Sequence, residues 1–319
     1  MEQRSASQRL SFFPVPFPDE LLDSVMYRYH RLSGNVHCQD TLEQFFGKRR
    51  RVIVKHMESD LDSLYSRIPD GLFSSCDDLI KRLTMLPAFS VLLPKDSMDD
   101  LKSCAHRNRY LGTSVHTYGI VRVLHSEIHC CPQCIRDEIE KYGTAYWHRS
   151  HQLEGVQVCH LHGCDLVWRC PHCSRLVRGP NSMDLPGPKC LSCNQRLLPS
   201  YSYPESVKEL ALLAHDALAV ESDYCYPYWM SHKVASKVGN DTARFCAEVQ
   251  KRYGSLYCAQ RDNECNRNLL SGDWLDRLLT WTNKKNFRYP TFSNALVLMH
   301  AFFGTWNEFT SRPNSGCIV

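Results

Sequence analysis

The sequence predicts a mainly α protein whose middle segment is stabilised by zinc and has mixed α+β character. Apolar residues recur at helical spacing before residue 112 and again after residue 200. Between these limits cysteine, histidine, glycine and proline become frequent, and short apolar runs at 119–124 and 165–168 favour strands. We therefore divide the 319 residues into an N-terminal helical domain (1–111), a tandem zinc-binding segment (112–200) and a C-terminal helical domain (201–319).

The first helix is expected within residues 19–34. Its apolar side chains recur at offsets that place them on one face of a helix. Pro18 suits the first turn, Asp19 and Glu20 suit the positive end of the helix dipole, and Gly34 is placed to end the helix.

Further short helices are expected at about 40–47, 59–68 and 75–85, and they complete a helical unit that ends near Pro94. Short helices joined by tight turns are typical of a helix-turn-helix. They are equally typical of any small helical bundle, so both interpretations stay open here.

The C-terminal domain is expected to be a helical bundle, with helices at 205–220, about 232–253, 271–283 and 293–309. The last stretch is apolar around most of its circumference, which indicates a buried helix. His300 within it is expected to be a hydrogen-bonded core residue rather than a metal ligand.

The 17 cysteines favour metal binding over disulfides. The chain is large, shows no signal peptide and has an odd number of cysteines, whereas disulfide frameworks belong to small secreted domains. No apolar run is long enough to span a membrane. We therefore expect a cytoplasmic protein.

Two sets of residues have the spacing of structural zinc sites, because two residues between ligands allow a tight turn to direct both side chains at one ion. One set has three thiols and an imidazole: Cys131, Cys134, Cys159 and His162. The other has four thiols: Cys170, Cys173, Cys190 and Cys193. We expect two structural Zn²⁺ ions.

Two alternatives remain open at the first set. Cys130, His160 or Cys164 could replace one of its ligands, although each breaks the two-residue spacing. The pairing could also be crossed between the two sets; sequential pairing is expected because each set closes without interleaving.

No catalytic pattern accompanies these ligands. The chain has no H-E-x-x-H sequence, no deaminase signature in the required order and no Gly-rich phosphate loop. We therefore expect that it is not an enzyme and that it has no catalytic residues.

Local basic clusters are the candidate DNA contacts, because a net charge of only +4 excludes a general polycation. One cluster follows the second helix: Lys48, Arg49, Arg50, Arg51 and Lys55. The other surrounds the four-cysteine set: Arg175, Arg178, Lys189 and Arg196. A solvated surface with no ligand is the competing interpretation.

Taken together, several stretches resemble the TniQ/TnsD family of target-selecting bacterial transposons. These are the opening "FFPVPFPDELLDSVMYRYHRLSGN", the middle stretch from "HCCPQC" to "CPHC" with a tryptophan between its metal ligands, and the late "LMHAFFG". The resemblance implies a helix-turn-helix domain, two zinc-finger motifs and a helical C-terminal domain in a bacterial protein.

The resemblance also implies a function. Such proteins act as adaptors that bind DNA, or a CRISPR effector on DNA, and recruit an AAA+ ATPase that regulates the transposase. The chain ends at Val319, before the longer DNA-binding part of members that read a fixed attachment site, which leaves sequence-specific reading open. A zinc-ribbon transcription regulator is the alternative function.

Three rings of the aromatic-proline lead are candidate partner contacts: Phe12, Phe13 and Phe17. The lead is apolar and semi-rigid, which suits docking, but packing against the first helix would explain it equally well.

Overall fold

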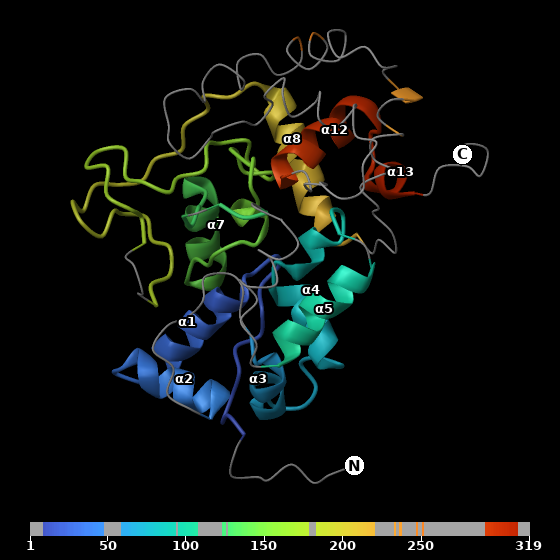
Figure 1. Cartoon of the computed structure of the whole chain (residues 1–319). Helices are drawn as coiled ribbons and strands as arrows, with labels where there is room; N and C mark the ends of the chain where they lie inside the picture. The colour runs from blue at the N-terminus through green and yellow to red at the C-terminus, as the bar shows by residue number, and fades with distance from the viewer. Residues whose placement is uncertain are drawn as a thin grey trace.

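The computed structural model describes residues 9–47, 59–93, 95–107, 123–125, 127–178, 183–220 and 291–311, together with the isolated positions 233, 236, 237, 247 and 251. Figure 1 shows one group of helices at the N-terminal end of the molecule and a second group at the opposite end. One helix of the middle segment lies between them. Across the described residues the chain is mainly helical.

The N-terminal group contains α1 (Leu22–Ser33), α2 (Cys38–Phe46), α3 (Leu61–Arg67), α4 (Cys76–Leu83), the short 3₁₀ helix η2 (Leu86–Phe89) and α5 (Lys95–His106). The first four lie where helices were predicted. The unit does not end near Pro94, because α5 follows it. Met98, Leu101 and Ala105 of α5 are buried at offsets of three and four residues, so the sequence did carry the signal for this helix. A helix-turn-helix within this group remains a prediction.

The entry into α1 differs from the prediction. Pro18 precedes the helix, and Asp19 adopts a left-handed backbone conformation with φ of 56°. Its carboxylate accepts hydrogen bonds from the N–H and the hydroxyl of Ser150, at 3.1 and 2.6 Å. Glu20 is fully buried 3.4 Å from Arg28. These acidic residues therefore form internal contacts rather than lying in the first turn of the helix.

The aromatic-proline lead packs against these helices. Phe13 is 6% exposed and meets Phe45 and Phe73 edge to face. Phe12 stacks on Tyr29. Phe17 stacks on Tyr142, and the centroids of these two rings lie 4.3 Å apart. Phe13 is therefore covered by the protein, whereas Phe12 and Phe17 are only partly buried, and a partner contact through the lead remains a prediction.

The middle segment contains α7 (Pro132–Tyr142) and the short 3₁₀ helix η3 (Ser150–Gln152). Its described residues form isolated antiparallel bridges and no strand of several residues. The strand expected at 165–168 is therefore reduced to bridges at Asp165 and Val167. The β contribution to the described part of the middle segment is therefore limited to these bridges. The other expected strand, at 119–124, lies mostly outside the described residues.

Trp147 joins the middle segment to the N-terminal helices. Its side chain is 1% exposed, and its carbonyl accepts a hydrogen bond of 2.9 Å from Leu21 N–H. Its own N–H donates to Ser24 Oγ at 3.0 Å, and its indole donates to the carbonyl of Asp184 at 2.8 Å.

The C-terminal group consists of α8 (Glu205–Ala217), α12 (Phe292–Phe302) and α13 (Trp306–Thr310) in the described residues. The single helix expected at 293–309 is two helices, because Gly304 turns left-handed with φ of 76° and Thr305 caps α13. The Nε2 of His300 lies within hydrogen-bond distance, 3.0 Å, of the carboxylate of Glu209 at the edge of the bundle.

The expected helices at 232–253 and 271–283 lie wholly or mostly outside the described residues. Among the residues that are described, no helix has the length and apolar character needed to cross a membrane.

Candidate metal centres

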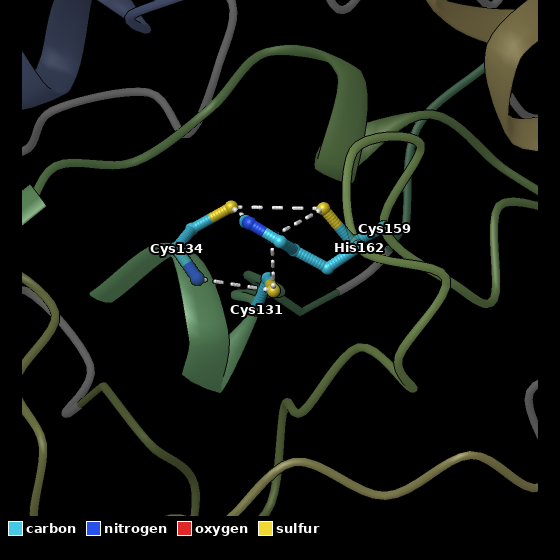
Figure 2. A group of neighbouring side chains, drawn as sticks. All are labelled: Cys131, Cys134, Cys159 and His162. Carbon is cyan, nitrogen blue, oxygen red and sulfur yellow. Dashed lines mark hydrogen bonds between the residues drawn. The ribbon is translucent and has the colours of Figure 1, made fainter. Parts of the chain in front are cut away.

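The first cluster brings together the three-thiol, one-imidazole set: Cys131, Cys134, Cys159 and His162. Figure 2 shows the four side chains converging on a common centre. The Sγ atoms of Cys134 and Cys159 lie 3.6 Å apart. His162 Nδ1 lies 3.5, 3.3 and 3.6 Å from the Sγ atoms of Cys131, Cys134 and Cys159, respectively. The imidazole thus faces the thiols through one defined nitrogen.

Local backbone structure explains this convergence. Cys131 is the N-cap of α7, Pro132 occupies the first helical turn, and the Sγ of Cys131 accepts the N–H of Cys134 at 3.3 Å. The start of the helix therefore directs both thiols to one side. Cys159 and His162 lie on a tight turn closed by a 2.7 Å hydrogen bond from Gly163 N–H to the carbonyl of Cys159.

The second nitrogen of His162 also has a partner. Its Nε2 lies 3.0 Å from the carboxylate of Asp137, which belongs to α7. A carboxylate on the outer ring nitrogen is the usual support of a histidine that binds metal, because it fixes the tautomer and the ring orientation. Spacing analysis did not find Asp137, since this contact depends on how α7 packs against the 159–163 turn.

The three alternative ligands have different surroundings. Cys164 is fully buried, and its Sγ lies 3.1 Å from that of Cys131. Cys130 directs its Sγ to the carbonyl of Val167 at 3.4 Å. His160 lies near Cys159 in a separate group with His151, but its Nδ1 is 3.3 Å from Ser150 Oγ and its ring stacks on His215. The geometry favours His162 over His160.

The second cluster contains the four-thiol set: Cys170, Cys173, Cys190 and Cys193. Sγ separations are 3.6 Å between Cys170 and Cys193 and 3.7 Å between Cys173 and Cys190. In both clusters the residues come together in sequential rather than crossed pairs.

The two halves of the second cluster are built alike. The N–H groups of His172 and Ser192 each donate to the Sγ of the first cysteine in their pair at 3.4 Å. Each turn then closes through a left-handed residue, with φ of 57° at Ser174 and 58° at Asn194. Isolated antiparallel bridges flank the two turns, joining Arg169 to Leu176 and Lys189 to Arg196.

These distances fit a tetrahedral ion. With zinc–sulfur bonds of about 2.3 Å and zinc–nitrogen bonds of about 2.0 Å, the ligand–ligand edges of a tetrahedron are about 3.8 Å for two sulfurs and about 3.5 Å for sulfur and nitrogen. The separations in both clusters lie near these lengths. Both clusters could therefore hold a metal, and their thiolate-rich donor sets are consistent with zinc.

The basic residues of the second cluster do not share one environment. Arg175, Lys189 and Arg196 are exposed. Arg178 is buried, donates a hydrogen bond to the hydroxyl of Tyr27 and places its guanidinium 4.8 Å from the centre of that ring. Arg178 therefore joins the middle segment to α1 and is withdrawn as a DNA contact. The other cluster, Lys48, Arg49, Arg50, Arg51 and Lys55, lies outside the described residues.

The fold and the two clusters define a helical protein with two cysteine-rich side-chain clusters, each of which could bind a metal ion. Comparison with known proteins identifies the family: the TniQ family model matches residues 11–166, which include the first centre and end before the second. Residues 11–166 of the chain thus belong to the TniQ family. It is also 24% identical over 155 residues to the Tn7 transposition protein TnsD of Escherichia coli, an alignment that covers 47% of this chain and 30% of TnsD.

The chain thus aligns with less than a third of that relative's length. The printed name of that relative describes it as a transposition protein.

Proposed function

We propose that the protein selects target sites for DNA transposition. It binds DNA, or a CRISPR effector assembled on DNA, and recruits the AAA+ ATPase that regulates the transposase. The observation that carries this proposal is the family match over residues 11–166, supported by the relative that is a transposition protein.

The two clusters hold Zn²⁺ in this proposal, and both ions are structural. Each set supplies four protein ligands and so leaves no open position for a reacting water. A loop-rich segment gains its stability in this way, because structural zinc contributes roughly 10 to 16 kcal/mol in zinc-finger peptides.

The second cluster and the two turns that carry its cysteines, here called the second metal module (169–196), supply a DNA-binding surface. Arg169, Arg175, Lys189 and Arg196 are exposed around its two turns, and Asp184 is the one exposed acid in the described residues from 168 to 198. The two bridges that flank the turns hold these cations on a small rigid scaffold. Phosphate neutralisation by such a surface gives affinity without requiring base-specific contacts.

Salt-dependent DNA binding tests this surface. Changing Arg175, Lys189 and Arg196 together to Ala should lower the slope of log affinity against log salt by up to about 2.7 on duplex DNA, at about 0.9 for each lost phosphate contact. A matched control changes three exposed lysines of α4 and α5, Lys81, Lys95 and Lys102. Equal slopes for the two triple variants would remove the second metal module from the DNA interface.

Recruitment needs its own experiment. The full chain should co-sediment with the AAA+ regulator of its own element in the presence of DNA and ATP, while showing no ATPase or nuclease activity alone. If no complex forms under any nucleotide or DNA condition, and the protein still binds a defined promoter-like site, the transcription-regulator function replaces this one.

A further inference from the structure

A third group of metal-ligating side chains lies in the N-terminal helices, away from both zinc clusters. It brings together Asp62 of α3, Cys76 of α4 and His106 of α5. One donor atom from each residue lies within 4.8 Å of the other two. The helices contribute one ligand each, so the group sits where α3, α4 and α5 meet.

The imidazole of His106 is held from both sides. Its Nδ1 lies 2.7 Å from the carboxylate of Asp62, and its Nε2 lies 3.0 Å from the carboxylate of Asp77. This arrangement parallels the first zinc cluster, where one nitrogen of His162 faces the thiols and the other faces Asp137. In such a pair, one carboxylate can share a metal with the ring while the other orients it.

Burial and exposure also suit a metal ligand set. Cys76 is 7% exposed beneath the cluster, whereas the side chains of Asp62 and Asp77 are 59% and 69% exposed. The thiol therefore approaches from the protein side, and the opposite side is open to solvent. An ion would enter from this side and replace the proton that lies between His106 Nδ1 and the carboxylate of Asp62.

We propose that Asp62, Cys76 and His106 form a third metal site, with Asp77 as the carboxylate that orients His106. Sulfur, nitrogen and oxygen donors together suit a borderline ion such as Zn²⁺ or Co²⁺, rather than Mg²⁺ or Ca²⁺. Three protein ligands leave the fourth position of a tetrahedral ion for water or for another added ligand. This ion would link three helices of the N-terminal unit.

This site differs from the two zinc clusters in the expected strength of binding. It offers one thiolate instead of three or four, and its carboxylate is exposed to water. The ion should therefore exchange readily, while the ions of the two closed clusters stay in place.

Zn²⁺ titration of the full chain is the test. The purified protein is first brought to two tightly held ions per chain, and Zn²⁺ alone is then added while heat release and bound metal are followed. The wild type should take up a third equivalent. Cys76→Ser and Asp62→Asn should each take up only the first two, and His37→Ala, which alters an exposed histidine outside the cluster, should behave as the wild type.

Circular dichroism shows whether each variant is folded before its titration is interpreted. Asp62→Asn keeps the size of the side chain, so it reports on the site even if Cys76→Ser disturbs the packing of α4. Absence of a third equivalent in the wild type would overturn the proposal. Retention of the third equivalent in both folded variants would also overturn it, since the ion would then lie elsewhere.

Discussion

The Nε2 of His162 lies 3.0 Å from the carboxylate of Asp137, while its Nδ1 faces the thiols of the first cluster. Because Asp137 lies on α7, the same helix that carries Cys134, one element supplies both a ligand and the group that orients another ligand. The tautomer of His162 is thereby fixed with its lone pair toward the cluster.

Asp137→Ala should lower the metal affinity of the first centre by about 10- to 100-fold, the usual effect of losing such a support. Competition with a chelator, followed by metal analysis, measures this effect, and the four-thiol centre serves as an internal reference. Glu140→Ala is the matched control, because Glu140 is an exposed acid on the same helix. Similar affinities for both variants would show that Asp137 does not support His162.

The ligand sets were predictable because short spacing fixes local geometry. Two residues between Cys170 and Cys173 allow one tight turn, and no distant part of the chain needs to be known. The role of Arg178 was not predictable in this way. In sequence it resembles Arg175, but it is buried against Tyr27, 151 residues away.

Helix boundaries show the same difference between local signals, which a sequence contains, and distant contacts, which it does not. Cys131, Pro132 and Gly143 form a cap, a first-turn proline and a left-handed end, so α7 could have been predicted. Cys131 has two roles in this pattern, as helix cap and as candidate metal ligand. Asp19 and Glu20 were assigned to a helix terminus because local rules cannot anticipate partners such as Ser150, which comes from a distant segment.

Cys173→Ser should release one ion and leave the other in place. The two clusters share no ligand, so loss of one thiolate opens the four-thiol centre alone. Metal analysis should fall from two ions to one, and limited trypsin digestion should cut near Arg169 and Arg175. Cys38→Ser is the control, because Cys38 is a free cysteine outside both clusters. Loss of both ions would show that the two centres fold as one unit.

Gly155→Ala should destabilise the contact between the middle segment and α12. Gly155 has φ of 87°, and an added Cβ would lie 2.6 Å from Ser293 Cβ and 3.1 Å from Ser293 Cα. Left-handed strain alone costs about 1 kcal/mol for a non-glycine residue, and overpacking adds about 1 to 3 kcal/mol.

Gly71→Ala separates these two costs. Gly71 has φ of 96°, but an added Cβ there meets nothing within 4 Å. Urea unfolding should therefore show that Gly155→Ala lowers the free energy of unfolding more than Gly71→Ala does. Equal losses would mean that the close approach to Ser293 is relieved at no cost.

Glu20→Gln should change the pH dependence of stability. Burial raises the pKa of Glu20 from 4.5 to about 7, although the nearby Arg28 guanidinium acts in the opposite direction. The folded protein then binds a proton at Glu20 more tightly than the unfolded chain does. The stabilising contribution of protonated Glu20 is therefore fully present below pH 4.5 and is lost as the pH rises through about 7. A shift of that size corresponds to about 3 kcal/mol.

The glutamine of this variant cannot titrate but keeps the shape of the native side chain. The free energy of unfolding of the variant, relative to the wild type, should therefore increase between about pH 5 and pH 8, so that the variant becomes relatively more stable as the pH rises. Measuring this difference cancels the titration of other groups, because both proteins share them. If Arg28 instead held Glu20 ionised at all these pH values, the variant would be less stable than the wild type throughout. A relative stability that stays constant between about pH 5 and pH 8, with the variant less stable at every pH, would therefore contradict the raised pKa and show that the Glu20–Arg28 ion pair outweighs the cost of burial.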